Sequence, residues 1–397
     1  MKSKFLGHSA NDLFWFILPL VMPSLLVRYE LSFAQAGGIL TTYLMVTAVF
    51  SFTVGKLADR ISRKKLLGYG FIVAAAGLAS SGFAPNLGVF LALISVTAVG
   101  VSTFHPVMYA VLDDLNHKNR GRIMGYYESF GTGAILLMFL INGYLMGFIG
   151  VRGILILTAG PALVMGLTYL FTDVIPDSVK AQSSRKDSEQ AEKKDILRFV
   201  LFLLSVILRV FSVTAVLNFL PTIFVSFMGY SESSAAYASA FFFGGGLLGS
   251  LIAGRLADRF NSFTILLGGT LLIIPSLFLF YLEIPPAVYP VVVALFGAFG
   301  SGCIINQNLL MSRMGRHLGS GEIFGILMGV MTVTSSFSPV LFGLTIDTAG
   351  YKPALLMFTA PLILSILLLM YLKRDSSEEG NLTPALQEEG WYETGKG

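Results

Sequence analysis

Charged residues are scarce in this chain of 397 residues. Asp, Glu, Lys and Arg together make up 13% of it, whereas a soluble domain carries about 25%. So few charges cannot cover a surface that faces water. Hydrophobic residues make up 54% of the chain, and its mean hydropathy is +0.75. The composition therefore excludes an ordinary soluble protein and indicates that lipid is the solvent for most of the chain.

Cysteine and the common catalytic motifs are also missing. A single cysteine, Cys303, excludes an intrachain disulfide framework. The sequence contains neither a Gly-x4-Gly-Lys-Ser/Thr phosphate loop nor a His-Glu-x-x-His metal motif, and no recognisable pairing of a nucleophile with a base. We therefore expect no enzyme activity, no cofactor, no resident metal and no nucleic-acid partner. Any uphill transport must draw on an ion gradient.

Long apolar stretches dominate what is present. A membrane-spanning helix needs roughly 20 mostly apolar residues, and charge-free stretches predict twelve such helices. They cover residues 13–27, 31–55, 66–112 (two spans, divided at 84–86), 129–151, 153–172, 196 towards 221, 233–254, 260–282, 284–312, 323–346 and 353–372. The sequence therefore predicts an all-α membrane protein with twelve transmembrane helices, which we expect to be a monomer in the lipid bilayer.

The basic residues predict the orientation, because Lys and Arg gather in cytoplasmic loops. With the N-terminus in the cytoplasm, 23 of the 27 Lys and Arg residues fall on the cytoplasmic side. Arg28, Arg152 and Lys352 fall outside, and Arg209 lies within a span. We therefore expect a multi-pass protein of the cytoplasmic (inner) membrane with both termini in the cytoplasm.

The sequence contains an internal repeat. The hexapeptide GKLADR at residues 55–60 returns as GRLADR at 254–259, an offset of 199. A Gly-x-x-x-Gly pair opens the fifth predicted span at 121–125 and the eleventh at 321–325, an offset of 200. Two matches at nearly one offset indicate two similar halves of six helices, with a substrate site between them near the middle of the membrane.

The repeat and the span positions divide the chain into four parts. We expect residues 1–172 to form an N-terminal six-helix bundle and residues 196–372 a C-terminal one. The polar, charged residues 173–195 then form a cytoplasmic linker. Residues 373–397 form a polar cytoplasmic tail, which we expect to be disordered.

One segment resembles the signature of a known family. The run GKLADRISRK at residues 55–64 is similar to the loop between helices two and three of the major facilitator superfamily. With the span count and the central linker, the resemblance covers essentially the whole chain. It implies a secondary transporter that works by alternating access, with helices one, four, seven and ten lining a central cavity.

A narrower resemblance covers the N-terminal half. The run HSAND at residues 8–12 and the tripeptide Phe104-His105-Pro106 are similar to the fosmidomycin-resistance branch of drug exporters. Val107 stands where that branch has Glu, and Met138-Phe139 where it has the Gly-Pro of the antiporter motif. The branch implies proton-coupled export, and the two differences leave other modes of transport open.

The family resemblance also implies a gate on the cytoplasmic side. Gly55 permits close approach of two helices. Asp59 would face the N-terminus of the eleventh helix near Gly321, where partial positive charge favours a carboxylate. The other gating candidates are Arg60, Arg63 with its expected partners Asp113 and Asp114, and, in the second copy, Asp258 and Arg259. The alternative is that the basic residues only direct topology.

Few polar side chains lie inside the predicted spans, where ionisable groups are costly and usually functional. The candidates for binding substrate or protons are Asp12, His105, Glu128, Arg209, Asn218, Asn306, Gln307 and Asn308. All except Glu128 fall on helices one, four, seven and ten. At most two of the three consecutive amides can line a cavity, because successive helical residues point about 100° apart.

Each candidate also has a purely structural interpretation. Asp12 could cap the first helix together with Asn11, and His8 could simply hydrogen-bond Asp12 four residues on. His105 could satisfy backbone groups freed by Pro106.

Arg209 needs an acceptor at its depth in the membrane. The candidate acceptors are Glu128, Asp12, a cavity water and an anionic group on the substrate. Glu128 is at the same time a candidate protonation site, beside Asp12.

The leading hypothesis is a secondary transporter that couples export of a small organic solute to protons. One alternative is an organic-anion symporter or uniporter with Arg209 as the anion-binding group, and another is a membrane sensor that does not transport. A divalent-metal carrier with Asp12, His105 and Glu128 as ligands is a further alternative, although the spacing of the three residues is not diagnostic.

Overall fold

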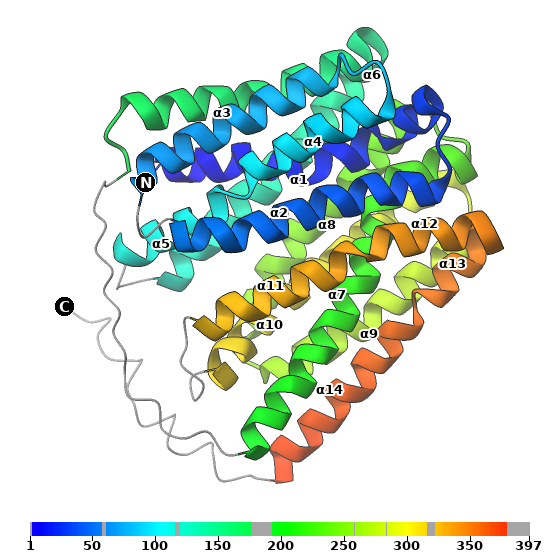
Figure 1. The fold of residues 1–397 in the computed structure, drawn as a ribbon. Helices are drawn as coiled ribbons and strands as arrows, with labels where there is room; N and C mark the ends of the chain where they lie inside the picture. The colour runs from blue at the N-terminus through cyan, green and yellow to red at the C-terminus, as the bar shows by residue number, and fades with distance from the viewer. Residues whose placement is uncertain are drawn as a thin grey trace.

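The computed structural model describes residues 2–57, 61–115, 120–175, 193–257, 259–282, 284–315 and 322–378. Throughout these residues the chain is helical, with short turns between helices and no strand (Figure 1). The prediction of an all-α protein is confirmed.

Six helices are found among the described residues of the N-terminal half. They are α1 (Lys2–Tyr29), α2 (Phe33–Leu57), α3 (Arg63–Ser81), α4 (Leu87–Val101), α5 (Phe104–Leu115) and α6 (Arg120–Phe171). The long helix α6 packs against both α1 and α3, while α4 packs against α2 and α3. The apolar side chains between these helices, such as Phe14, Phe71 and Phe104, are almost fully buried.

The C-terminal half has the same helical character. It consists of α7 (Lys193–Met228), α8 (Glu232–Ala257), α9 (Ser262–Tyr281), the short 3-10 turn η1 (Pro286–Val288), α10 (Tyr289–Gly315), α11 (Glu322–Ser336), α12 (Ser338–Ala349), α13 (Tyr351–Met357) and α14 (Ala360–Glu378). Helix α10 packs along α8 through glycines that leave no room for a side chain, because a Cβ on Gly249 or Gly297 would meet backbone atoms of the facing helix.

Ten helices in the described part of the chain are long and apolar enough to cross a membrane. One of them, Tyr126–Phe171, is 46 residues long and is interrupted at Gly150, whose φ of 58° is not helical. A break there separates the predicted fifth and sixth spans, 129–151 and 153–172. Helix α3, which begins with three basic residues, is not among the ten. The protein is thus a multi-pass membrane protein, and the count of twelve crossings stays a prediction.

Three predicted spans are broken by the structure into shorter helices. The fourth is divided between α4 and α5 at residues 102–103, the eleventh between α11 and α12 at Phe337, and the twelfth between α13 and α14 at residues 358–359. A proline follows each break within the first turn of the next helix, at Pro106, Pro339 and Pro361. Proline lacks an N–H and is tolerated in the first turn of a helix, where that N–H would have no partner, so a helix readily restarts there.

Helix ends differ from the predicted boundaries at several places. Helix α1 begins at Lys2, eleven residues before the predicted start at Leu13. Helix α7 begins at Lys193, inside the predicted linker, and α14 continues to Glu378, inside the predicted tail. Charged residues can extend a helix beyond the hydrocarbon layer, so apolar runs mark the span and not the whole helix. Residues 176–192 and 379–397 lie outside the described residues.

The internal repeat extends to the backbone at turns. Gly150 and Gly350, 200 residues apart, both have positive φ, at 58° and 94°. Glu30 and Gly229, 199 residues apart, also share positive φ, at 51° and 72°. The two halves therefore repeat the same turns after their first and fifth spans, counted as predicted.

The halves meet along a few helix pairs. Helix α2 packs against α11 and α12, α6 against α8, and α1 against α7. In Figure 1, α2 and α12 run side by side, whereas α14 and the start of α7 diverge from the N-terminal half. The contacts between halves include hydrogen bonds near the start of α2, where Thr41 Oγ1 accepts from the backbone N–H of Val340 at 3.3 Å.

Candidate functional site

Helix α1 carries the first two members of a polar cluster. Because α1 begins at Lys2, Asn11 and Asp12 lie roughly three turns inside it. Neither residue can therefore cap the helix, and that interpretation of Asp12 is wrong. His8 lies one turn earlier, with its Nε2 atom 3.3 Å from Oδ2 of Asp12. The side chain of His8 is 1% exposed and that of Asp12 is 14% exposed.

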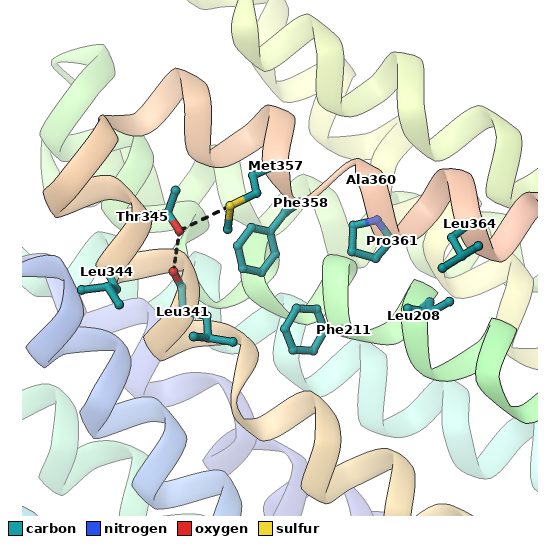
Figure 2. A pocket seen from close by; sticks show the side chains of 10 residues that line it. All are labelled: Leu208, Phe211, Leu341, Leu344, Thr345, Met357, Phe358, Ala360, Pro361 and Leu364. Carbon is teal, nitrogen blue, oxygen red and sulfur yellow. Dashed lines mark hydrogen bonds between the residues drawn. The ribbon is translucent and has the colours of Figure 1, made fainter.

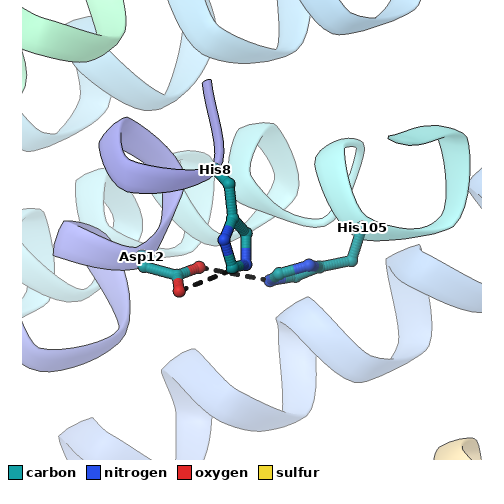
Figure 3. A group of neighbouring side chains, drawn as sticks. All are labelled: His8, Asp12 and His105. Atoms are coloured by element: carbon teal, nitrogen blue, oxygen red, sulfur yellow. Dashed lines mark ion pairs between the residues drawn. The ribbon is translucent and has the colours of Figure 1, made fainter. Parts of the chain in front are cut away.

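Helix α5 brings the third member, His105, to the same carboxylate. Its Nε2 atom lies 3.5 Å from Oδ1 of Asp12, so the carboxylate has one imidazole at each oxygen (Figure 3). The break before α5 places Pro106 in the first turn of that helix, where its missing N–H leaves no carbonyl of α5 without a donor. His105 is therefore not needed to repair the helix at this proline.

Hydrogen bonds to the two imidazoles define which ring nitrogens carry hydrogen. Nδ1 of His8 lies 2.8 Å from the carbonyl oxygen of Tyr127. A carbonyl can only accept, so this nitrogen donates and Nε2 of His8 offers its lone pair to Asp12 in the neutral ring. The amide nitrogen of Asn11 lies 3.2 Å from Nε2 of His105 and donates to it. The carboxyl of Asp12 thus faces the available lone pair of His8, and a proton can be held between these two groups. The lone pair of His105 Nε2 is already engaged by Asn11.

Helix α6 closes the cluster from the other side. A Cβ on Gly131 would collide with Oδ2 of Asp12 and would lie 2.7 Å from Cε1 of His8. Only glycine permits this approach. The ring of Tyr127 stacks on His8 with centroids 3.7 Å apart. The spacing of four residues between His8 and Asp12 indicated this contact in the sequence, whereas nothing in the sequence indicated Gly131.

Glu128 lies next to the cluster without belonging to it. The side chain is exposed, and its carboxylate is near enough to repel that of Asp12 electrostatically. Its position on α6, one residue after Tyr127, keeps it at the edge of the cluster.

The three groups also meet the distance requirement for a cation. The ligand atoms of His8, Asp12 and His105 lie within 4.8 Å of one another. The metal alternative considered from sequence used Glu128 as third ligand; the structure brings His8 to that position.

Helices α7 and α10 form a second polar group in the C-terminal half. The guanidinium of Arg209 donates to Oε1 of Gln307, and both side chains are buried, at 2% and 3% exposure. Nε2 of Gln307 lies 3.8 Å from the sulfur of Met331 on α11. In the part of the chain that the structure describes, neither Glu128 nor Asp12 forms an ion pair with Arg209. The partner of Arg209 is therefore a neutral amide, which was not among the acceptors expected from sequence.

The remaining amides fall into three environments. Asn218 donates to the carbonyl of Thr214 at 2.8 Å, one turn back in its own helix. Asn306 is fully buried, and neither its Oδ1 nor its Nδ2 has a hydrogen-bond partner among the described residues. Asn308 is exposed. Gln307 and Asn306 are thus the two amides that point inward, in agreement with the limit set by helix geometry.

The cytoplasmic gate predicted from the loop signature lies largely outside the described residues. Asp59, Arg60 and Asp258 are among the residues that are not described, and the surroundings of Gly55, Asp113 and Asp114 are not described either. Arg63 is the first residue of α3 and is 6% exposed, whereas Arg259 is exposed in the turn after α8. These gating roles stay predictions.

An ion pair that the sequence did not indicate lies close to Arg63. Nζ of Lys64 lies 2.7 Å from Oδ1 of Asp173. This ion pair joins the start of α3 to the segment directly after α6. This hydrogen bond and the positive charge of Lys64 hold the pKa of Asp173 below its usual value.

A separate apolar groove of about 540 Å³ lies between α7, α12, α13 and α14 (Figure 2). Phe211, Phe358 and Pro361 are among its lining residues, and none of the predicted site residues lines it. The hydroxyl of Thr345 donates to the carbonyl of Leu341 at 2.8 Å, so the polar atom on this wall is already bonded. The groove therefore offers hydrocarbon contact and no charge.

One family model matches most of the sequence. The model of the major facilitator superfamily matches residues 5–322. The chain belongs to the major facilitator superfamily. It is therefore a transporter and not an enzyme, as the loop signature at 55–64 predicted.

Relatives of this superfamily member cover most of both chains. The MFS-type transporter YfnC of Bacillus subtilis (strain 168) is 25% identical over 371 residues, covering 91% of this chain and 89% of the relative. The fosmidomycin resistance protein of Escherichia coli (strain K12) is 23% identical, covering 82% of each. The proton-coupled antiporter flippase LtaA of Staphylococcus saprophyticus is 24% identical, covering 77% of this chain and 76% of the relative.

Solved structures of other superfamily members share the fold. A bacterial homologue of the human lysosomal transporter Spinster, in an inward-facing and unoccupied conformation, superposes with a TM-score of 0.76 at 15% identity, covering 94% of this chain and 96% of that one. A mutant form of the nucleoside transporter NupG gives a TM-score of 0.77 at 13% identity, covering 93% and 98%.

Proposed function

We propose that this transporter exports a small organic solute from the cytoplasm in exchange for protons, with Asp12, His8 and His105 as the proton site. The observation that carries the proposal is the carboxyl of Asp12 between two imidazole nitrogens, at 3.3 and 3.5 Å. Such a group can hold a proton in one state and release it in another, because Oδ2 of Asp12 and Nε2 of His8 compete for the same hydrogen. Charged groups inside a membrane protein are seldom retained without such a use.

The location of the cluster supports coupling to conformational change. His8 and Asp12 lie on α1, His105 on α5, and the cluster is closed by Gly131 of α6. Rocking of the two halves exposes a central site to alternate sides of the membrane, and α1 is one of the helices that contact the other half. A change in water access to Asp12 then changes its proton occupancy.

A substrate group can bind next to the proton site. The indole of Trp15, one turn after Asn11, has its centroid 6.0 Å from that of His105. The indole Nε1 is buried and has no hydrogen-bond partner among the described residues. It is a donor that a substrate oxygen can satisfy. Two relatives are named for proton-coupled antiport and for fosmidomycin resistance, which supports exchange and export for this chain.

The proposal includes a topology. The N- and C-termini lie in the cytoplasm, twelve helices cross the membrane, and residues 173–195 join the bundles 1–172 and 196–372. The distribution of Lys and Arg supports this orientation. Under it, the start of α2 lies at the outer surface and the start of α3 at the inner surface.

The proton site is tested by accumulation in proteoliposomes that contain a trapped pH dye. A panel of organic solutes is added, and the solute that moves protons is followed as a function of the pH difference. Exchange of one proton for one neutral solute supports about a tenfold solute gradient for each pH unit. We expect Asp12→Asn to keep solute exchange and lose this gradient. Glu128→Gln is the matched control and should retain it.

Accumulation by Asp12→Asn at the wild-type level contradicts the proposal. Loss of the gradient in Glu128→Gln but not in Asp12→Asn would move the proton site to Glu128.

An organic-anion symporter or uniporter is the second candidate. The observation in its favour is that Arg209 is buried against a neutral amide and forms no ion pair within the described residues. An anionic group of the substrate would supply the missing charge. Comparing inverted with right-side-out vesicles under one pH gradient separates the candidates, because a symporter and an antiporter accumulate solute in opposite orientations.

A further inference from the structure

The N-terminus of α2 is capped only in part by its own half. The hydroxyl of Ser32 accepts from the backbone N–H of Gln35 at 3.2 Å, and the side chain of Gln35 accepts from the backbone N–H of Ser32 at 2.9 Å. This capping box satisfies the third N–H of the helix. The first two N–H groups, on Phe33 and Ala34, have no acceptor inside their own helix, as at any helix start.

A carboxylate from the other half takes both remaining groups. Oδ1 of Asp347, on α12, accepts from the N–H of Phe33 at 3.0 Å, and Oδ2 accepts from the N–H of Ala34 at 2.8 Å. A carboxylate at this position also meets the partial positive charge of the helix N-terminus. The cap of α2 is therefore complete only while the two halves touch at this end.

Glycines hold the two backbones close enough for this contact. A Cβ on Gly343, one turn before Asp347, would lie 2.5 Å from the carbonyl carbon of Phe33. A Cβ on Gly37 would lie 2.6 Å from the carbonyl carbon of Pro339. No larger side chain can enter between the helices, so the position of Asp347 over the end of α2 is fixed by backbone packing. Figure 1 shows α2 and α12 side by side.

The repeat supplies a second contact of the same kind without the carboxylate. Gly143 of α6, 200 residues before Gly343, packs against α8, where its added Cβ would lie 2.9 Å from that of Ala236. The α8 N-terminus has its own local cap, since Ser231 Oγ accepts from the N–H of Ser234 at 3.2 Å. The position that corresponds to Asp347 is Gly147. The α6–α8 contact therefore has no carboxylate at the position of Asp347.

We infer that Asp347 is a gating residue, whose two hydrogen bonds to α2 determine how often the halves separate at this end. The inference rests on the proposed function only for the side of the membrane, since the proposed topology places this end at the outer surface. When the contact opens, Phe33 and Ala34 lose their acceptor and the substrate site becomes reachable from that side. A contact at the same end, from the hydroxyl of Ser24 to Oε1 of Glu232 at 2.5 Å, stays in place when Asp347 is removed.

The test measures how often this end opens, without any substrate. A cysteine replaces Ser336, which is 1% exposed and lies 3.9 Å from the sulfur of Met45 across the interface, in a Cys303→Ser background. A membrane-impermeant maleimide is then applied to intact cells. Losing a helix cap of this kind corresponds to about a tenfold change in an equilibrium. We therefore expect Asp347→Ala to raise the labelling rate about tenfold and Asp347→Glu to restore much of the protection.

The repeat also allows the opposite substitution, in which a carboxylate is added. Gly147→Asp places a carboxylate at the corresponding position of the α6–α8 contact, where an added Cβ has open space. We expect this variant to label more slowly than the wild type, and a rate above the wild type overturns the inference. Glu30→Gln removes a negative charge near the same end and leaves both hydrogen bonds of Asp347 intact. Its labelling rate should equal that of the wild type.

A second buried position separates gating from loss of folding. Ser365 is fully buried inside the C-terminal half, where its hydroxyl donates to the carbonyl of Ser205 at 2.7 Å. Cysteine at this position should stay protected in every variant. Unchanged labelling of the Ser336 cysteine in Asp347→Ala, or equal increases at both positions, overturns the gating role. An increase seen only in inverted vesicles overturns the outer location. Neither measurement depends on proton coupling, so failure of the proposed function is recognised separately.

Discussion

The same two helices in each half carry polar groups of opposite chemistry. In the N-terminal half, α1 and α5 bring two imidazoles to the carboxyl of Asp12. In the C-terminal half, α7 and α10 bring a guanidinium to an amide. Neither group is repeated, because Phe211 lies 199 residues after Asp12 and Val107 lies 200 residues before Gln307. The duplicated backbone thus holds two different sites.

This difference suggests a division of work between the halves. The N-terminal cluster can gain and lose a proton, whereas the guanidinium of Arg209 keeps its charge at any physiological pH. We therefore propose that the first cluster responds to pH and that the second, together with Trp15, binds the substrate. Variants of one cluster should leave the property of the other unchanged, and the predictions below test that separation.

The largest effect is expected for Arg209→Gln. Removing a buried, hydrogen-bonded charge from a binding site costs about 2 kcal/mol or more, which corresponds to at least about 30-fold in affinity. We expect KM for the transported solute to rise by that factor while the pH midpoint of transport stays unchanged. Arg209→Lys should recover only part, because the planar fork of arginine is lost. Detergent-solubilised melting measured beside transport decides the role: a collapse in stability together with activity would make Arg209 a scaffold residue.

The next effect concerns the two histidines. His105→Gln should move the pH midpoint of transport by about one unit, the equivalent of about 1.4 kcal/mol, with KM unchanged. His8→Leu should in addition lower the free energy of unfolding by about 0.5–1.5 kcal/mol, because the hydrogen bond from His8 to the carbonyl of Tyr127 is lost. Transport is measured between pH 5 and pH 8 and compared with thermal melting. A change in KM without any change in the pH profile would contradict the proposal that the two clusters have separate roles.

Asn306 should show a smaller effect, with stability and activity changing in opposite directions. Its amide is fully buried and unbonded among the described residues, which costs about 1–3 kcal/mol of stability. Asn306→Leu should therefore raise the melting temperature and weaken solute binding, since polar groups kept at such a cost are usually functional. A variant that melts higher and transports normally would assign Asn306 to the scaffold alone, and the substrate site would then rest on Arg209 and Gln307.

The sequence was sufficient to predict the fold, because lipid as solvent allows only a few kinds of structure. Long apolar stretches can only be membrane helices, and two repeated motifs at offsets of 199 and 200 already indicate two halves. The ends of the helices were harder to predict. The start of α1 at Lys2 could not be inferred from an apolar run that begins at Leu13. The breaks before Pro106, Pro339 and Pro361 follow from the missing N–H of proline and leave a signal in the sequence.

The types of residue in the site could be predicted from the sequence, but the contacts between them could not. Ionisable residues in spans marked Asp12, His105 and Arg209. Their contacts depend on how helices distant in sequence rotate against each other, and periodicity does not contain that rotation. His8 joined the cluster through α5 and α6, Arg209 met Gln307 in place of a carboxylate, and Asp347 met α2 across 314 residues. Each of these contacts depends on the tertiary structure.

The smallest effect is expected for the ion pair at the start of α3. Asp173 is fully exposed, so its hydrogen bond to Lys64 at 2.7 Å is screened by water and contributes little. Lys64 holds the pKa of Asp173 below its ordinary value of 3.8. A lowered folded pKa gives stability that is present above the unfolded pKa and is lost only as the pH falls further. Between pH 5 and pH 8 the pair is therefore constant, and Asp173→Asn should leave transport, its pH profile and melting unchanged. A shifted pH profile in this variant, measured beside His105→Gln, would mean that the pH response does not belong to the buried cluster alone.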